Sequence, residues 1–176
     1  METTIPEFGI KRENEERRDG GCGVVFDPAS QTYAVNKFQN GLLGFFSGGV
    51  DAGEDIQTGV LREVTEESGL DDFLHVEKIA EAMTHYYNIL KNVNRVAKAT
   101  CFLIILKSTH QIPVHREAHE TFTLAWATAE EIMANMESFN ENHDNDHWIY
   151  FLQKAVARAK ELGYDKASLI NTKITP

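Results

Sequence analysis

The pattern of apolar and polar positions predicts strands and helices mixed along the chain. Apolar runs, some alternating with polar positions, predict strands over 23–26, 32–37, 42–46, 75–88, 96–107 and 121–127. The turn residues Asp27–Ser30 indicate that the first two strands form a hairpin. Cys101–Leu106 is apolar at every position, which is typical of a strand in the centre of a sheet.

Apolar residues at helical spacing predict three helices. These cover Glu54 to Ser68, Glu130 to Met136 and about His147 to Leu162. Strands mixed with helices in this order indicate an α/β fold, an α/β/α sandwich with a mixed central sheet. The length of 176 residues favours a single domain over 1–176, and the polar N-terminal segment 1–20 is expected to be partly mobile.

Composition excludes several classes of protein. No run approaches the roughly 18 apolar residues of a membrane span, and the N-terminus lacks an apolar leader, so we expect a cytoplasmic protein that does not enter a membrane. Cys22 and Cys101 lie in apolar runs and are expected to be buried thiols without a disulfide. A net charge of −10 argues against binding to duplex nucleic acid.

The charges are unevenly distributed. The segments 54–81 and 117–153 are strongly acidic, whereas 82–116 contains no acid and carries the bases Lys91, Arg95, Lys98, Lys107 and Arg116. An acidic cluster beside a basic segment suits a metal cation held together with a polyanionic substrate. Ordinary solvated surfaces explain the same charge pattern equally well.

Three glutamates on the helix predicted at Glu54–Ser68 form the most informative constellation. Glu63, Glu66 and Glu67 stand at i, i+3 and i+4, so their carboxylates share one face. Converging carboxylates suit a hard divalent cation, which takes oxygen ligands. Arg62 is expected to point away from this face, in reach of an ion pair with Glu54 two turns earlier.

The stretch Gly48 to Leu70 resembles the Nudix box. Its fixed positions are all filled, by Gly48, Glu54, Arg62-Glu63, Val64, Glu66-Glu67, Gly69 and Leu70. The resemblance implies that Glu63, Glu66 and Glu67 are metal ligands, often joined by the Gly48 carbonyl. It also implies that Glu54 and Arg62, with Gly49 and Gly69, keep the loop–helix–loop in shape. Ser47 departs from the proline that many members carry before the two glycines.

The resemblance also implies an activity. Nudix hydrolases cleave a nucleoside diphosphate linked to a group X, by attack of water on one phosphorus with the assistance of Mg²⁺ or Mn²⁺. The expected partner is therefore a nucleotide substrate, bound by a monomer or a homodimer. A different class of function, a Nudix module that senses a nucleotide without cleaving it, is disfavoured because all three glutamates are present.

A second, weaker resemblance points to a subgroup. Residues 115–131 are similar to Nudix enzymes that hydrolyse diadenosine tetraphosphate, in the pair His119-Glu120, in Trp126 and in Glu130-Glu131. Glu120 would then be an extra metal ligand or general base, with Glu117 as its rival. Dinucleoside polyphosphates are thus the first choice of substrate. Nucleotide sugars, mutagenic nucleotides and RNA 5′ ends are the alternatives.

The segment 86–95 supplies candidate substrate contacts. In the same subgroup a tyrosine and basic residues near this point contact base and phosphates, which implies such roles for Tyr86, Tyr87, Lys91, Arg95 and Lys98. The alternatives are sheet packing for the tyrosines and a solvated hairpin tip for the bases. The segment His143–His147 has the residue types of a metal site, but we interpret its Asp and Asn residues as helix caps.

Overall fold

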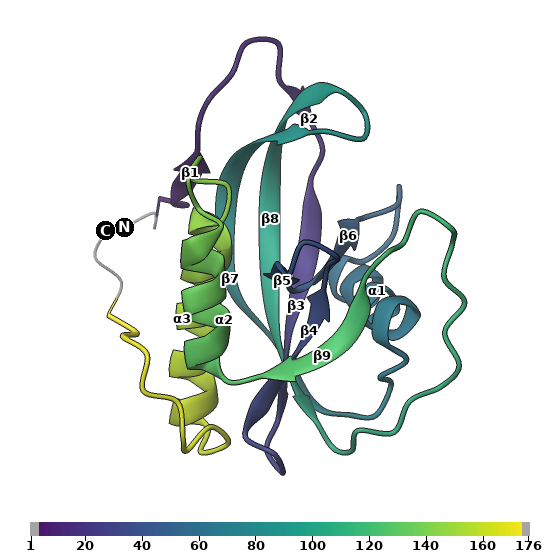
Figure 1. Cartoon of the computed structure of the whole chain (residues 1–176), viewed down its shortest axis with the longest axis vertical. Helices are drawn as coiled ribbons and strands as arrows, with labels where there is room; N and C mark the ends of the chain where they lie inside the picture. The colour runs from purple at the N-terminus through teal and green to yellow at the C-terminus, as the bar shows by residue number, and fades with distance from the viewer. Residues whose placement is uncertain (1–3, 174–176) are drawn as a thin grey trace.

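A computed structural model describes residues 4–173, and its strands join one mixed sheet flanked by helices (Figure 1). The elements, in chain order, are β1 (Glu7–Gly9), β2 (Glu16–Arg17), β3 (Gly20–Asp27), β4 (Thr32–Lys37), β5 (Leu43–Gly44), β6 (Phe46–Gly49), α1 (Ile56–Ser68), β7 (Phe73–Asn88), β8 (Val93–Leu106), β9 (Thr123–Ala127), α2 (Ala129–Ser138) and α3 (Asp146–Glu161).

The apolar strand β8 lies in the middle of the sheet, as its composition predicted. The principal strand order is β1-β7-β8-β3-β4-β5. β8 forms a long antiparallel hairpin with β7 and runs parallel to β3, where Gly20 pairs with Ala99 and Phe26 with Ile105. β3 and β4 form the predicted hairpin, and β9 adds to the other edge of β4.

The helices cover both faces of the sheet and enclose two cores. On one face Val60 and Val64 of α1 pack with Phe46 and Ile104. On the other face α3 contributes a cluster around the fully buried Phe151, and α2 packs against α3. Figure 1 shows α1 on one side of the strands and α2 and α3 on the opposite side. The predicted α/β/α sandwich with a mixed sheet is therefore confirmed.

The polar N-terminal segment contains strands that the sequence pattern did not predict. β1 pairs with β7 and β2 with β8, both in parallel. The buried His85 ring holds this segment to β7, since Nε2 lies 2.7 Å from Glu7 Oε1 and Nδ1 lies 2.9 Å from Glu15 Oε2. These two strands are thus stabilised by contacts with residues distant in sequence. They lack the apolar periodicity on which strand prediction depends.

The strand predicted over 42–46 is divided into two. β5 ends at Gly44, β6 begins at Phe46, and the buried Phe45 between them packs its ring 6.1 Å from that of Trp148. The break lets β5 pair with β4 while β6 pairs with β3. β6 thereby brings Gly48 and Gly49 to the end of the sheet where β3 starts.

Cys22 and Cys101 are both buried free thiols. Within residues 4–173 no helix combines the length and the apolar character needed to cross a membrane.

Candidate functional site

Helix α1 is fixed at both ends by the residues that flank it. The Asp55 carboxylate caps the N-terminus by accepting a 3.1 Å hydrogen bond from the Thr58 backbone N–H. Gly69 ends the helix with φ of 78° and donates its N–H to the Thr65 carbonyl. A Cβ at Gly69 would stand 2.4 Å from the Ile112 carbonyl oxygen, so only glycine fits this position.

Arg62 connects the loop before α1 to the glutamates of the helix. Its Nε and Nη2 donate to Glu54 at 3.0 and 3.2 Å, which lowers the pKa of Glu54 and confirms the expected ion pair. The expectation that Arg62 points away from the glutamate face is wrong. Its Nη1 lies 3.0 Å from Glu63 Oε1 and 3.1 Å from Glu66 Oε2, because the long side chain spans from one side of the helix to the other.

The two glycines of β6 allow close approach of charged side chains to the backbone. A Cβ on Gly48 would lie 2.3 Å from the carboxyl carbon of Glu63, and one on Gly49 would lie 2.7 Å from Nη2 of Arg18. Burial raises the pKa of Glu63, because its ionised form loses hydration. Gly48 and Gly49 therefore bring a carboxylate and a guanidinium against adjacent positions of the same strand.

Glu67 is held by a residue from the sheet rather than by Arg62. Its Oε2 accepts a 2.7 Å hydrogen bond from the Asn36 amide on β4, and its backbone carbonyl accepts one of 2.8 Å from Arg116. Burial raises the pKa of the Glu67 carboxyl to about 7, against the opposing effect of the Asn36 hydrogen bond. The role of Asn36 could not be predicted, because one asparagine in an apolar strand carries no local signal.

The loop before β9 carries both candidates for the loop carboxylate, Glu120 and Glu117. Glu120 is half-buried and its charge acts on Glu67, contributing to the raised pKa of that carboxyl. Glu117 has a side chain 77% exposed and lies 3.4 Å from His119. Burial and charge thus favour Glu120 over Glu117, and its role in the site stays a prediction.

The carboxylates of α1 suit a divalent metal in their chemistry. They offer hard oxygen donors, with Glu63 against the Gly48 backbone and Glu67 partly buried. Within the described part of the chain, no three His, Cys, Asp or Glu side chains form a group that could hold a metal as they stand. Arg62 and Asn36 occupy oxygens of the carboxylates instead. The oxygen donors therefore fit Mg²⁺ or Mn²⁺ in kind, and the ligand roles stay predictions.

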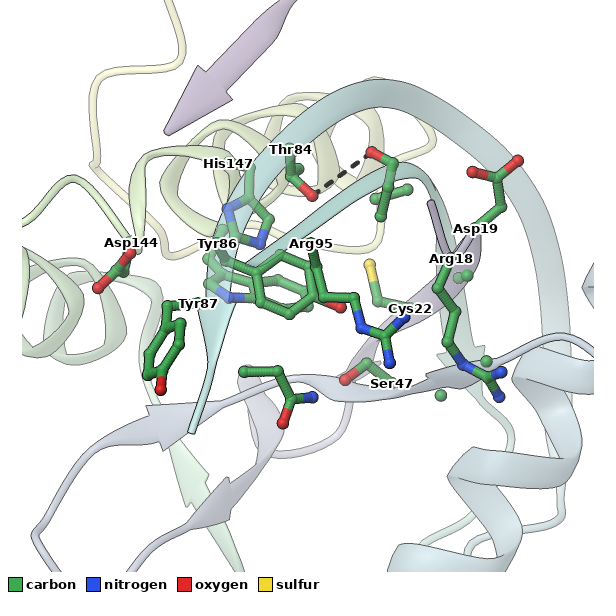
Figure 2. A pocket seen from close by; sticks show the side chains of 18 of the residues that line it. Arg18, Asp19, Cys22, Ser47, Thr84, Tyr86, Tyr87, Arg95, Asp144 and His147 are labelled. Carbon is green, nitrogen blue, oxygen red and sulfur yellow. Dashed lines mark hydrogen bonds between the residues drawn. The ribbon is translucent and has the colours of Figure 1, made fainter. Parts of the chain in front are cut away.

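A cavity of about 510 Å³ opens beside Gly48, between the sheet and the start of α3. Figure 2 shows Tyr86, Arg95 and His147 around this space, with the Cys22 sulfur and Arg18 also beside it. Its wall is made by segments far apart in sequence, including Arg18, Asp19, Cys22, Ser47, Thr84, Asn88, Asp144, Asn145, His147 and Trp148. A cavity of this size suits a ligand of roughly nucleotide dimensions.

The structure brings Tyr86, Tyr87, Lys91 and Arg95 to the cavity wall, and their contacts with a substrate stay a prediction. Lys98 is the exception, because its Nζ pairs with Glu81 at 3.1 Å and it does not line the cavity. Arg18, His147 and Trp148 also line the cavity and were not predicted, because their positions depend on the packing of distant segments.

The His143–His147 segment forms a turn before α3. The prediction that its Asp and Asn side chains cap this helix is wrong. Asn145 occupies the N-cap position but makes no side-chain cap, and its amide donates to the Met136 and Phe139 carbonyls instead. The Asp146 carboxylate accepts a hydrogen bond from Asn140 and contacts His143. The ring of His147 is buried, and burial lowers its pKa to about 4.

Comparisons with known proteins agree with the fold and the motif. The family model of the NUDIX domain matches residues 17–154. A NUDIX hydrolase from Nitrosomonas europaea superposes with a TM-score of 0.54 at 18% identity, covering 85% of this chain and 91% of that chain. A C. elegans Ap4A hydrolase gives a TM-score of 0.56 at 15% identity, covering 82% of this chain and 98% of that one.

A third solved structure of similar fold is the NUDIX domain of Shewanella oneidensis NrtR complexed with ADP ribose. It has a TM-score of 0.54 and 13% identity, and the alignment covers 84% of this chain and 90% of that chain. The search of curated proteins returned no match.

Proposed function

Because the chain belongs to the NUDIX family, we propose that it is a divalent-metal-dependent pyrophosphohydrolase of nucleoside diphosphate derivatives, with dinucleoside polyphosphates as its preferred substrates. One observation carries this proposal. Gly48, against which the Glu63 carboxylate lies, lines the same cavity as Tyr86, Lys91 and Arg95. The fold shared with the C. elegans Ap4A hydrolase supports the choice of substrate.

In this proposal Glu63, Glu66 and Glu67 hold Mg²⁺ or Mn²⁺, together with the Gly48 carbonyl and Glu120. The bound cation supplies charge neutralisation on the phosphates and an acidified water. Arg62 and Glu54 keep the preceding loop in place, as their paired hydrogen bonds of 3.0 and 3.2 Å indicate. No residue forms a covalent intermediate in this proposal, because water attacks the phosphorus directly.

In this proposal, different residues of the cavity wall bind the base and the phosphates of the substrate. The aromatic faces of Tyr86 and Trp148 stack a nucleobase, a contact that is worth about 1–3 kcal/mol per base. Arg18, Lys91 and Arg95 bind phosphate oxygens on the way to Gly48. A base at the far end and phosphates at the Gly48 end place the pyrophosphate beside α1.

A second candidate is a module that binds a nucleotide without cleaving it. The NUDIX domain of Shewanella oneidensis NrtR, in complex with ADP ribose, has a similar fold. All three glutamates on α1 are present here, and pure nucleotide binding has less need of them. We therefore rank hydrolysis first.

The test is a panel of substrates with Mg²⁺ and with Mn²⁺, with products identified by mass. It contains diadenosine tetraphosphate, ADP-ribose, a nucleotide sugar, an oxidised nucleoside triphosphate and a 5′-triphosphorylated RNA. Cleavage of diadenosine tetraphosphate at the highest kcat/KM, abolished by EDTA, is the expected outcome. Binding of ADP-ribose without cleavage of any compound would favour the non-catalytic module.

The same proposal covers location and assembly. The two free thiols Cys22 and Cys101 suit the reducing cytoplasm, and the acidic net charge of −10 disfavours duplex nucleic acid as a partner. Size-exclusion chromatography with light scattering would distinguish between a monomer and a homodimer, the two expected states.

A further inference from the structure

Asn36 is a buried polar residue at an otherwise apolar place in the sheet. It follows the fully buried run Tyr33–Val35 on β4 and is itself only 2% exposed. Its neighbours across the sheet are Gly44 of β5 and Leu124 of β9. A buried amide is retained at such a position only when its polar atoms have partners.

The amide nitrogen of Asn36 has one strong partner. Nδ2 donates a short hydrogen bond of 2.7 Å to Glu67 Oε2. The reverse orientation would place the amide oxygen against the carboxylate, so the pairing itself decides which end faces Glu67. Of the three glutamates on α1, Glu63 and Glu66 are held by Arg62 of the same helix, whereas Glu67 is held from the sheet.

The amide oxygen of Asn36 has no partner. Oδ1 is buried and makes no hydrogen bond with any residue from 4 to 173. A buried acceptor without a donor destabilises a fold, and in native proteins such an atom points to a bound water or ligand group. The orphan acceptor and the bonded donor belong to one small side chain next to Glu67.

We propose that Asn36 is a positioning residue of the candidate metal site: Nδ2 fixes the Glu67 carboxylate, and Oδ1 accepts a hydrogen bond from a water molecule held beside it. The inference rests on the proposed function, because it assigns Glu67 to a metal. Fixing one carboxylate from the rigid sheet lets it keep its orientation when the oxygens bound by Arg62 change partners. Loss of such a support for a metal ligand typically costs about 10–100-fold in metal affinity or activity.

The test compares Mn²⁺ binding by calorimetry, the rise in Tm on adding Mn²⁺, and kinetics in three variants. Asn36→Leu removes both polar atoms at similar volume, and Asn36→Ser keeps a small polar group that is too short to reach Glu67. Tyr33→Phe is the matched control, because it deletes a buried hydrogen bond of 2.7 Å to Asp165 from the same strand, away from α1. If Asn36→Leu fails to fold, Asn36→Ser supplies the same comparison.

Both Asn36 variants should bind Mn²⁺ about 10–100-fold more weakly and lose kcat by a similar factor, with KM for the nucleotide nearly unchanged. Tyr33→Phe should lower Tm and leave Mn²⁺ affinity as in the wild type. Wild-type affinity in the Asn36 variants, or an equal loss in Tyr33→Phe, overturns the inference and leaves the proposed function standing. A wild-type protein that neither binds Mn²⁺ nor cleaves any substrate overturns both.

Discussion

Tyr86 on β7 and Arg95 on β8 are register partners, and both line the cavity beside Gly48. Arg95 Nη1 lies 2.8 Å from Glu16 Oε2, and the side chain is 11% exposed. Its Nε is buried and has no hydrogen-bond partner in the described chain, residues 4–173. An aromatic ring and a guanidinium therefore line the same space from neighbouring strands, which suits a base and a phosphate of one ligand.

Arg95→Ala should raise KM for a long polyphosphate substrate by about 10- to 100-fold, because a charge-assisted hydrogen bond is lost. The increase should be smaller for a short nucleotide sugar. Steady-state kinetics at low and high salt will show whether the contact is direct, since a direct contact persists in salt. Lys98→Ala is the control, as Lys98 pairs with Glu81 outside the cavity. Unchanged constants in Arg95→Ala for every substrate would remove Arg95 from the site.

Glu67→Gln should reduce turnover by orders of magnitude, because a neutral amide binds Mg²⁺ poorly. The metal-free variant should also be more stable than the wild type above pH 7. Burial raises the pKa of Glu67 to about 7, so stability is lost as pH rises from the usual carboxyl range through that value. In EDTA at pH 8 we expect Tm to increase by roughly 2–4 °C for each kcal/mol relieved.

Glu66→Gln is the comparison for that result. It should lower turnover as well, but without the gain in Tm, because it weakens the 3.1 Å ion pair with Arg62. Near-normal turnover in both variants would contradict the assignment of these glutamates to a metal.

Glu120→Gln should lower kcat more than it raises KM, since Glu120 is the half-buried loop carboxylate whose charge acts on Glu67. Glu117→Gln should have little effect, because its side chain is 77% exposed. Single-turnover kinetics with saturating substrate measures the chemical step. A larger effect from Glu117→Gln would transfer the role to that residue.

Arg18→Ala should weaken ATP binding about tenfold or more in EDTA, where no metal contributes. Its guanidinium lies against Gly49 on the cavity wall, and no carboxylate of residues 4–173 pairs with it. Trp148 on the same wall lets intrinsic fluorescence report the titration. Arg17→Ala is a matched control one position away, as Arg17 pairs with Asp19 at 3.0 Å. Equal losses in the two variants would indicate only a general effect of charge.

His147→Phe should flatten the decline of stability in acid. Burial lowers the pKa of His147 to about 4, so the folded state favours the neutral ring, and stability is lost as pH falls from about 6.5 towards 4. Urea unfolding at pH 7 and pH 4 should show the wild type losing up to about 3 kcal/mol more than the variant. His143→Gln, with a side chain that is 63% exposed in the wild type, should behave as the wild type does.

Local patterns predicted the elements that depend on local interactions. β4 was predicted with its observed bounds, and α1 was predicted within two residues, because periodicity and capping residues lie next to one another in sequence. The shared face of Glu63, Glu66 and Glu67 was predicted for the same reason, since the three are neighbours on one helix. In a helix, the spacing of residues along the sequence fixes which face their side chains share.

The remaining features depend on partners that lie far away in sequence. β1 and β2 form because residues near the N-terminus pair with β7, β8 and the buried His85. The role inferred for Asn36 depends on its hydrogen bond to Glu67, which lies on a different element. Lys98 was misplaced because its pairing with Glu81 on the neighbouring strand decides where its charge lies.

The parallel pairing of β3 with β8 imposes an order on synthesis and folding. Residues 20–26 emerge from the ribosome early, but their partners at 99–105 follow much later, so one edge of β3 stays open in the meantime. The antiparallel neighbours β4 and β6 can pair first, whereas the apolar β8 must find a waiting strand. A nascent chain paused before residue 99 therefore exposes an unpaired edge of β3, and a chain truncated there should aggregate more readily than the full chain.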